Sequence, residues 1–328
     1  MKPNRNKSTA NLSFTIKALV SRIVDGKSQI SNKELIELCQ TSTNSFFEAD
    51  DPHIFHEIAE TSLNFLTKTH FATDLLITND PVKNVSKIIK PLAQILPTQT
   101  WRSPQQIKFQ QFSTPPAIAY LLAYLLNLRP QETILEPSAG TGNLAIWASI
   151  AGAIVLTNEI DKRRRELLEH LGFEPTAFDA EFIHDFLPPE VTADVVIMNP
   201  PFSANGGRTK NSSKYGFRHV ESALERLKGG GKFGIILGEA GGLDTKTGRE
   251  FWRKTVERFD IKANVQLSGH EYYKNGTTVD INLIFGEKLI EPRQVDRTKG
   301  VNQILFLTAQ TVEEAFDKVA THNLRFNQ

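Results

Sequence analysis

The sequence of 328 residues lacks several features that would mark particular classes of protein. Its only cysteine is Cys39, so an intramolecular disulfide and a cysteine-rich zinc site are both excluded. Residues 1–6 contain no apolar stretch typical of a signal peptide, and no apolar run approaches the roughly 20 residues that a membrane helix needs. A formal net charge of +1 gives no global sign of nucleic-acid binding. We therefore expect a cytoplasmic chain in which any such binding depends on a local patch or a partner.

Histidines give no sign of a metal site. His53 and His56 lie on one face of an expected helix at i, i+3 spacing, but the sequence offers no convincing further ligand near them. We therefore expect no bound metal and interpret both as packing or surface residues.

The spacing of apolar residues divides the chain into three parts. Residues 1–100 follow helical periodicity throughout, which predicts an all-helical N-terminal domain. From residue 101 to 290, strand and helix patterns alternate, which predicts a doubly wound α/β sheet, mostly parallel, with its last strand antiparallel. Residues 291–328 are expected to form a tail with one short strand and one helix. The strands are expected at 133–135, 153–157, 195–198, 233–237, 265–267, 280–285 and 304–307, and another is expected to end at Asp179.

A glycine-rich segment joins the first expected strand to a helix. It reads Glu136, Pro137, Ser138, Ala139, Gly140, Thr141, Gly142. Glycines let the backbone turn tightly and approach a ligand without a Cβ in the way. The segment matches a dinucleotide fingerprint that a nicotinamide enzyme and an S-adenosylmethionine enzyme would share, and a tight turn without a ligand is the alternative.

Two acidic residues follow at the ends of later strands. Glu159 lies about 20 residues beyond the glycines, a position suited to ribose hydroxyls, although an acid near a helix start is the alternative. Asp179 is placed to accept from an adenine amino group, and a solvated turn aspartate is its alternative.

The run Asn199, Pro200, Pro201, Phe202 directly follows the apolar residues 193–198. The prolines end that strand because they cannot donate ladder hydrogen bonds. Asn199 is therefore expected at a carboxyl strand end, where open α/β sheets bind ligands. Its amide oxygen and the proline carbonyls can accept from a planar exocyclic amine, and Phe202 can stack on the ring.

Ser113 and Thr114 precede a helix that begins near Pro116. Either hydroxyl is expected to cap that helix, and the exposed amides of the helix start are expected to hold a carboxylate.

Three of these segments together resemble one family. The order of Phe112–Pro115, Glu136–Gly142 and Asn199–Phe202 is similar to that of the gamma-class adenine-N6 DNA methyltransferases, over residues 105–290. The resemblance implies a Rossmann-like class I methyltransferase sheet, S-adenosyl-L-methionine as cofactor, and methyl transfer to a flipped adenine. It implies a catalytic run of Asn199, Pro200, Pro201 and Phe202, and a cofactor held by Thr114, Glu136, Pro137, Ser138, Ala139, Gly140, Gly142, Glu159, Asp179 and Asn199.

A basic, aromatic stretch follows the catalytic run. Such composition suits phosphate contact and base stacking, and an ordinary solvated loop is the alternative. The candidates for nucleic-acid contact are Arg208, Lys210, Lys214, Tyr215 and Arg218.

The sequence departs from the gamma class in one respect. Only a short tail follows Phe285, where that class carries a sizeable target-recognition domain, so recognition would come from the helical domain, the basic stretch or a partner subunit. We expect DNA rather than RNA as substrate. The alternatives are RNA methylation at adenine-N6 or guanine-N2, a non-catalytic nucleic-acid-binding subunit, and, ranked low, a nicotinamide dehydrogenase. Cytosine-C5 methylation is rejected because it needs a cysteine nucleophile at the position of the Asn199–Phe202 run, whereas Cys39 lies in the helical domain.

Overall fold

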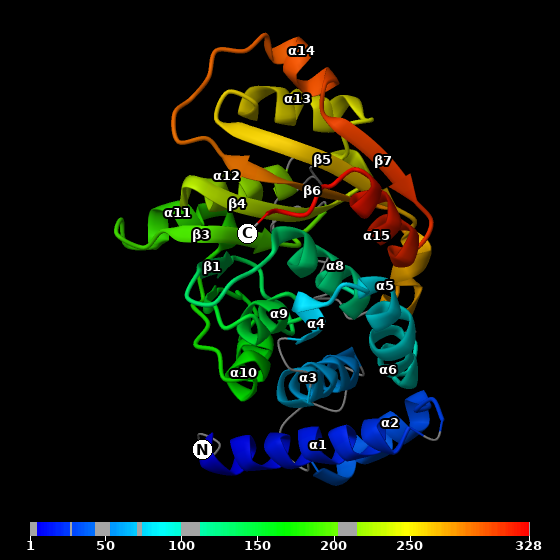
Figure 1. Cartoon of the computed structure of the whole chain (residues 1–328). Helices are drawn as coiled ribbons and strands as arrows, with labels where there is room; N and C mark the ends of the chain where they lie inside the picture. Colours follow the sequence, from blue (N-terminus) through cyan, green and yellow to red (C-terminus); the bar gives the residue numbers. More distant parts are fainter. Residues whose placement is uncertain are drawn as a thin grey trace.

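The computed structural model describes residues 5–26, 28–42, 53–70, 74–99, 112–202 and 215–327. A seven-stranded sheet built from these residues has the order β2-β1-β3-β4-β6-β5-β7 (Figure 1). Its strands are β1 (Thr133–Glu136), β2 (Ile154–Thr157), β3 (Ala193–Met198), β4 (Leu227–Gly238), β5 (Phe259–Leu267), β6 (Ile281–Lys288) and β7 (Leu305–Ala309).

The strand pairing confirms the expected doubly wound, mostly parallel sheet. The strands β2, β1, β3 and β4 pair in parallel, whereas β6 is antiparallel to both β4 and β5. The chain winds from β1 outward to β2 and then returns to β3 on the other side, so the strand order reverses between β1 and β3. Such a switch point leaves a crevice beyond the carboxyl ends of the strands.

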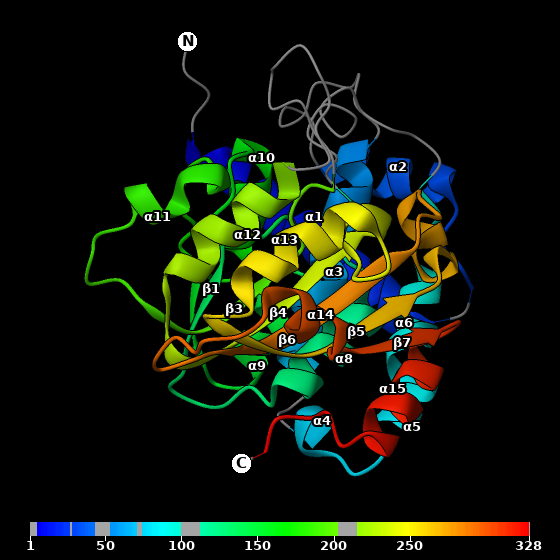
Figure 2. The same ribbon diagram turned by 90° about the horizontal axis from the view of Figure 1, so that it is seen from above.

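Helices cover both faces of the sheet (Figure 2). One face packs against α8 (Pro116–Leu126), α9 (Ala145–Ile150) and α15 (Val312–Thr321), and the other against α12 (Tyr215–Glu225) and α13 (Lys246–Thr255). Strands β1 and β3 are buried on both sides, which explains why their sequences are continuous apolar runs. Helix α10 (Lys162–His170) follows β2.

The N-terminal residues form a helical layer below the sheet in Figure 1. Helices α1 (Arg5–Asp25), α2 (Asn32–Ser42) and α3 (His53–His70) share an apolar core, to which α10 contributes Leu167. The chain continues through α4 (Asp74–Ile77), α5 (Pro81–Asn84), the π-helical turn η1 (Val85–Ile89) and α6 (Lys90–Ile95). Helix α3 buries polar as well as apolar side chains, because it packs against α1 on one side and against α9 and α10 on another.

The structure corrects three details of the expected elements. The strand expected to end at Asp179 is reduced to an isolated bridge between Asn158 and Thr176. Helical spacing of apolar residues predicts a helix over residues 246–259, but α13 ends at Thr255 and Phe259 begins β5. The last strand, β7, pairs with β5 at the edge of the sheet, so the residues expected as a tail extend the main sheet. The division into three domains stays a prediction.

The described residues contain no helix both long and apolar enough to cross a bilayer. They also contain no group of three or more His, Cys, Asp or Glu side chains arranged to hold a metal ion.

Candidate functional site

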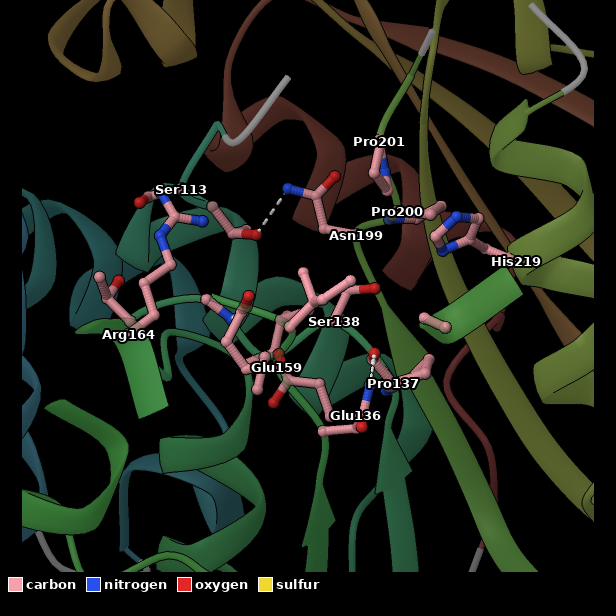
Figure 3. A pocket seen from close by; sticks show the side chains of 18 of the residues that line it. Ser113, Glu136, Pro137, Ser138, Glu159, Arg164, Asn199, Pro200, Pro201 and His219 are labelled. Atoms are coloured by element: carbon pink, nitrogen blue, oxygen red, sulfur yellow. Dashed lines mark hydrogen bonds between the residues drawn. The ribbon is translucent and has the colours of Figure 1, made fainter. Parts of the chain in front are cut away.

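A pocket opens beyond the carboxyl ends of β1, β2 and β3, at the switch point of the sheet. Its lining includes all four residues of the catalytic run and every predicted cofactor-binding residue except Gly142. The segment before α8, the loop after β1 and the ends of β2 and β3 therefore converge on one cavity (Figure 3).

The loop after β1 depends on its two glycines. Gly140 and Gly142 have φ angles of +57° and +89°, in the region that side chains other than glycine rarely adopt. A Cβ on Gly142 would lie 2.8 Å from the Leu171 side chain, so this glycine lets the loop pack on the end of α10. Gly142 supports the cavity from behind, while Gly140 faces it.

Two buried carboxyl groups form the floor of the pocket. Glu159 accepts hydrogen bonds from the amides of Gly140 and Asp161, both at 2.8 Å. Glu136 Oε2 is buried and accepts no hydrogen bond within the part of the chain that the structure describes. Burial raises the pKa of both groups, and their mutual repulsion contributes at Glu136. Acceptors this poorly solvated favour a ligand that brings hydroxyl or cationic donors.

Asp179 lies on the rim of the same pocket. Its side chain accepts from the Glu181 amide at 3.0 Å and so caps the short 3₁₀ turn η2 (Ala180–Phe182). Asn158 fixes this rim, because its amide nitrogen donates to the carbonyls of Pro137 and Phe178 at 2.9 and 3.0 Å. Asp179 therefore both caps this turn and lines the pocket.

Asn199 is held in one orientation. Its Nδ2 donates to Thr114 Oγ1 at 2.9 Å and to the Phe112 carbonyl at 3.2 Å. A carbonyl only accepts, so the nitrogen must face Phe112 and the oxygen must face away from it. Asn199 Oδ1 is buried and accepts no aligned hydrogen bond from the described residues. The site thus presents one unsatisfied acceptor next to Pro200.

Tyr272 lies behind this amide, in the 3₁₀ turn η4 (Gly269–Asn275). The side chain is fully buried, and its hydroxyl lies near the side chains of Thr114 and Asn199. Burial raises the pKa of Tyr272, so its hydroxyl keeps its proton. Sequence reasoning missed this residue, because nothing local distinguishes it from a core tyrosine.

The other members of the catalytic run differ in their surroundings. The Phe202 ring packs over Gly238 at the end of β4, where a Cβ would come within 2.9 Å of the ring. The Pro201 carbonyl lies against Gly216, where a Cβ would come within 2.7 Å of it. Both contacts therefore depend on a glycine at the facing position.

Helix α3 contributes no residue to the lining of the pocket but lies directly behind it, as a supporting wall. Asn64 Nδ2 donates to the Thr141 carbonyl at 2.9 Å and to Asn143 Oδ1 at 2.6 Å. Asn143 Nδ2 in turn donates to the Thr114 carbonyl at 2.7 Å. A continuous chain of hydrogen bonds therefore links the helical layer to Thr114 and, through it, to Asn199.

Two acidic residues of α3 extend this wall. Glu60 accepts from Thr141 Oγ1 at 3.0 Å, from Gln99 at 2.7 Å and from Asn275 at 3.2 Å. Glu57 Oε1 accepts from Arg164 Nε at 2.8 Å. Burial opposes ionisation of Glu57, but the Arg164 guanidinium and His53 lower its pKa to about 2. The helical layer is thus joined to the glycine loop by buried polar contacts.

His219 of α12 also lines the pocket, next to Pro200 in Figure 3. Burial lowers its pKa to about 4, against the opposing effect of Asp179 and Glu181. The imidazole is therefore neutral at neutral pH. Nothing local in the sequence singles out His219, Arg164, Asn143 or Asn158, whose positions in the pocket depend on tertiary packing.

The helix cap expected before α8 is wrong. The N-cap residue is Pro115, without a side-chain cap, and the amides of Ile118 and Ala119 donate to its carbonyl. Thr114 Oγ1 instead accepts from Asn199.

The predicted nucleic-acid contacts are described only in part. Arg208, Lys210 and Lys214 lie outside the described residues, as does the side chain of Tyr215. Arg218 forms an ion pair with Glu181 at 2.7 Å and is about half exposed.

Comparison with known proteins gives one partial sequence match. No protein-family model matches the chain. Over 170 residues it is 30% identical to the tRNA (guanine(10)-N2)-dimethyltransferase of Methanothermobacter thermautotrophicus strain Delta H, which covers 49% of this chain and 47% of the relative. The chain thus spans about half the length of the curated relative that it matches.

Solved structures define the fold. A Listeria monocytogenes protein, provisionally described as a class I S-adenosylmethionine-dependent methyltransferase, aligns with a TM-score of 0.54 and 13% identity, over 98% of this chain and all of that one. A modification subunit of a provisionally assigned type I restriction enzyme from Vibrio vulnificus aligns with a TM-score of 0.52 and 12% identity, over 89% of this chain and 62% of that one. The fold is that of class I S-adenosylmethionine-dependent methyltransferases.

Proposed function

We propose that this chain transfers a methyl group from S-adenosyl-L-methionine to the exocyclic N6 amine of adenine in DNA. The observation that carries the proposal is the fixed amide of Asn199, whose buried oxygen is the unsatisfied acceptor at the carboxyl end of β3. An exocyclic amine is a poor nucleophile because its lone pair is delocalised into the ring. Acceptors at Asn199 Oδ1 and the Pro200 carbonyl would bind its hydrogens and localise that pair on nitrogen.

The cofactor fits the remaining residues of the pocket. When bound, it supplies an electrophilic sulfonium methyl group. The buried acceptors of Glu136 and Glu159 suit a cationic ligand with ribose hydroxyls, Asp179 would accept from its adenine, and the Gly140 turn leaves room for close approach. Thr114 would border the methionine end, since it lies between the glycine loop and Asn199.

The target base would be flipped out of its helix, because a paired base cannot enter such a pocket. Phe202, fixed on Gly238, offers the flat surface on which the base would stack. A partner subunit for target recognition is part of this proposal, because the chain shares its fold with the Vibrio vulnificus modification subunit.

A second candidate is methylation of a guanine-N2 amine in RNA. It is favoured by the 30% identity with the tRNA (guanine(10)-N2)-dimethyltransferase. The same pair of acceptors would serve either amine, so the substrate must be determined by product analysis.

The test is methyl transfer from tritiated cofactor to duplex DNA, tRNA, ribosomal RNA and protein, followed by digestion to nucleosides. We expect the label in N6-methyladenine of DNA. Label in N2-methylguanine of RNA would replace the first candidate by the second, and label confined to protein would refute both. Asn199→Ala should abolish the label, whereas Asn302→Ala, at an exposed asparagine of α14 (Arg297–Asn302), should retain it.

A further inference from the structure

One cationic side chain, that of Arg164, lines the pocket. Arg164 is the only lysine or arginine among the described residues that line the cavity. His219, the other nitrogen base in the lining, is neutral because burial lowers its pKa to about 4. The fixed positive charge of the pocket therefore comes from Arg164.

The position of Arg164 is set from two sides. Its side chain is 5% exposed, and its Nε donates to Glu57 of α3, whose own side chain is fully buried. Its Nη1 lies 3.7 Å from the point where a Cβ on Gly140 would be, so the guanidinium extends along the glycine loop. A guanidinium carries five donors in a planar fork, so one edge can bind Glu57 while another binds a second acid.

The start of α8 cannot easily supply the anion site that the sequence predicted there. Pro115 and Pro116 have no N–H, and the amides of Ile118 and Ala119 both donate to the Pro115 carbonyl. Figure 3 shows Arg164 beside Ser113, directly before this helix, and across the cavity from Pro200 and His219. The guanidinium thus occupies the side of the pocket where helix amides were expected to bind a carboxylate.

S-Adenosyl-L-methionine carries one anionic group, the α-carboxylate of its methionine end. We infer that Arg164 binds this carboxylate and that Glu57 is a positioning residue for Arg164. The inference rests on the proposed cofactor but not on the proposed nucleic acid. It makes the helical layer a contributor to cofactor affinity, because α3 holds the side chain that would recognise the ligand.

The test is calorimetric titration of the full chain, without nucleic acid, with three ligands. S-Adenosylhomocysteine has the carboxylate, its decarboxylated analogue keeps only the ammonium group, and 5′-methylthioadenosine lacks the amino-acid end altogether. Arg164→Gln should lower the affinity for S-adenosylhomocysteine by roughly ten- to a hundredfold, as expected for the loss of a charge-assisted hydrogen bond. It should change the affinity for the other two ligands by less than about threefold. Arg163→Gln, which removes a partner of Asp161, should leave all three affinities near those of the unchanged chain.

The outcomes separate ligand recognition from general damage. Equal weakening of all three ligands by Arg164→Gln, or unchanged affinity for S-adenosylhomocysteine, would overturn the inference. If that variant does not fold, Glu57→Gln combined with Arg164→Gln removes both buried charges and is tested with the same ligands and the same criteria. Failure of the unchanged chain to bind S-adenosylhomocysteine would instead refute the proposed function.

Discussion

The glycine wall that lines the pocket and the α3 wall behind it are built in different ways. The wall formed by the loop after β1 depends on backbone geometry, with two glycines at positive φ and the Gly140 amide directed at Glu159. The wall formed by α3 depends on buried side chains, with Glu57, Glu60 and Asn64 reaching across from another layer. The first wall is local in sequence, whereas the second joins residues about 80 to 110 positions apart. A change in either wall should therefore weaken the site, but for different physical reasons.

The largest expected effect is on the α3 wall. Glu57→Ala leaves the Arg164 guanidinium buried without its carboxylate, which should cost about 3–5 kcal/mol of unfolding free energy. Urea denaturation measures this loss. Glu37→Ala, at an exposed ion pair in α2, should change stability by no more than about 0.5 kcal/mol. If Glu57→Ala lowered the free energy of unfolding as little as Glu37→Ala does, the ion pair of Glu57 and Arg164 would not be buried in solution.

On the glycine wall, Gly142→Ala should cost about 2–4 kcal/mol, because strain at positive φ adds to crowding against Leu171. Gly152→Ala is a matched control at a φ of +80°, where the Cβ would make only ordinary contacts with Pro130. The control should lose about 1 kcal/mol. Equal thermal shifts for the two variants would contradict the crowding at Gly142.

The link between the two walls can be weakened at Asn64. Asn64→Asp replaces the amide donor by an oxygen that faces the Thr141 carbonyl and Asn143 Oδ1, so it should cost about 1–3 kcal/mol. Because Asn143 also holds Thr114, kcat should fall more than the affinity for S-adenosylhomocysteine does. Stopped assays and calorimetry measure the two quantities. Asn302→Asp on the surface serves as control. Equal changes of stability and of kcat in the two variants would contradict the link through Asn64.

The smallest expected effect is the pH dependence of stability that two buried histidines contribute, one in α3 and one in α12. Burial lowers the pKa of His56 in α3 and of His219 in α12 to about 4. Below the ordinary value of 6.5, the unfolded chain binds protons that the folded chain excludes, so stability falls as pH falls from about 6.5 to about 4. His219→Asn should reduce this slope by about 1 kcal/mol per pH unit, as should His56→Asn. An unchanged slope in denaturation between about pH 6 and pH 5 would contradict the burial of that ring.

The difference between the two walls also explains which strands and site residues could be predicted from the sequence. The strands β1 and β3 were predictable because each is a short apolar run followed by turn residues, Pro137 and the glycines in one case and Pro200 and Pro201 in the other. Residues that follow such strands are brought to one sheet edge by topology alone. The pocket therefore collects Glu136, Glu159 and Asn199 without any long-range information.

The α3 wall could not be predicted in the same way. Glu57, Glu60 and Asn64 look like the polar face of an ordinary surface helix, and only packing against α9 and α10 buries them. The cap before α8 was mispredicted for a related reason. Thr114 is a good capping residue, but its hydroxyl accepts from the more distant Asn199 instead.

In the proposed function, the fixed amide of Asn199 assists methyl transfer and does not merely support the pocket. Single-turnover methyl transfer by Asn199→Ala, measured together with calorimetric binding of S-adenosylhomocysteine, tests it most directly. We expect a rate lower by about 10²–10³-fold, with cofactor affinity within about threefold of the unchanged chain. A rate that stays within about threefold would refute this role of Asn199, and so would a loss of rate fully explained by lost cofactor binding.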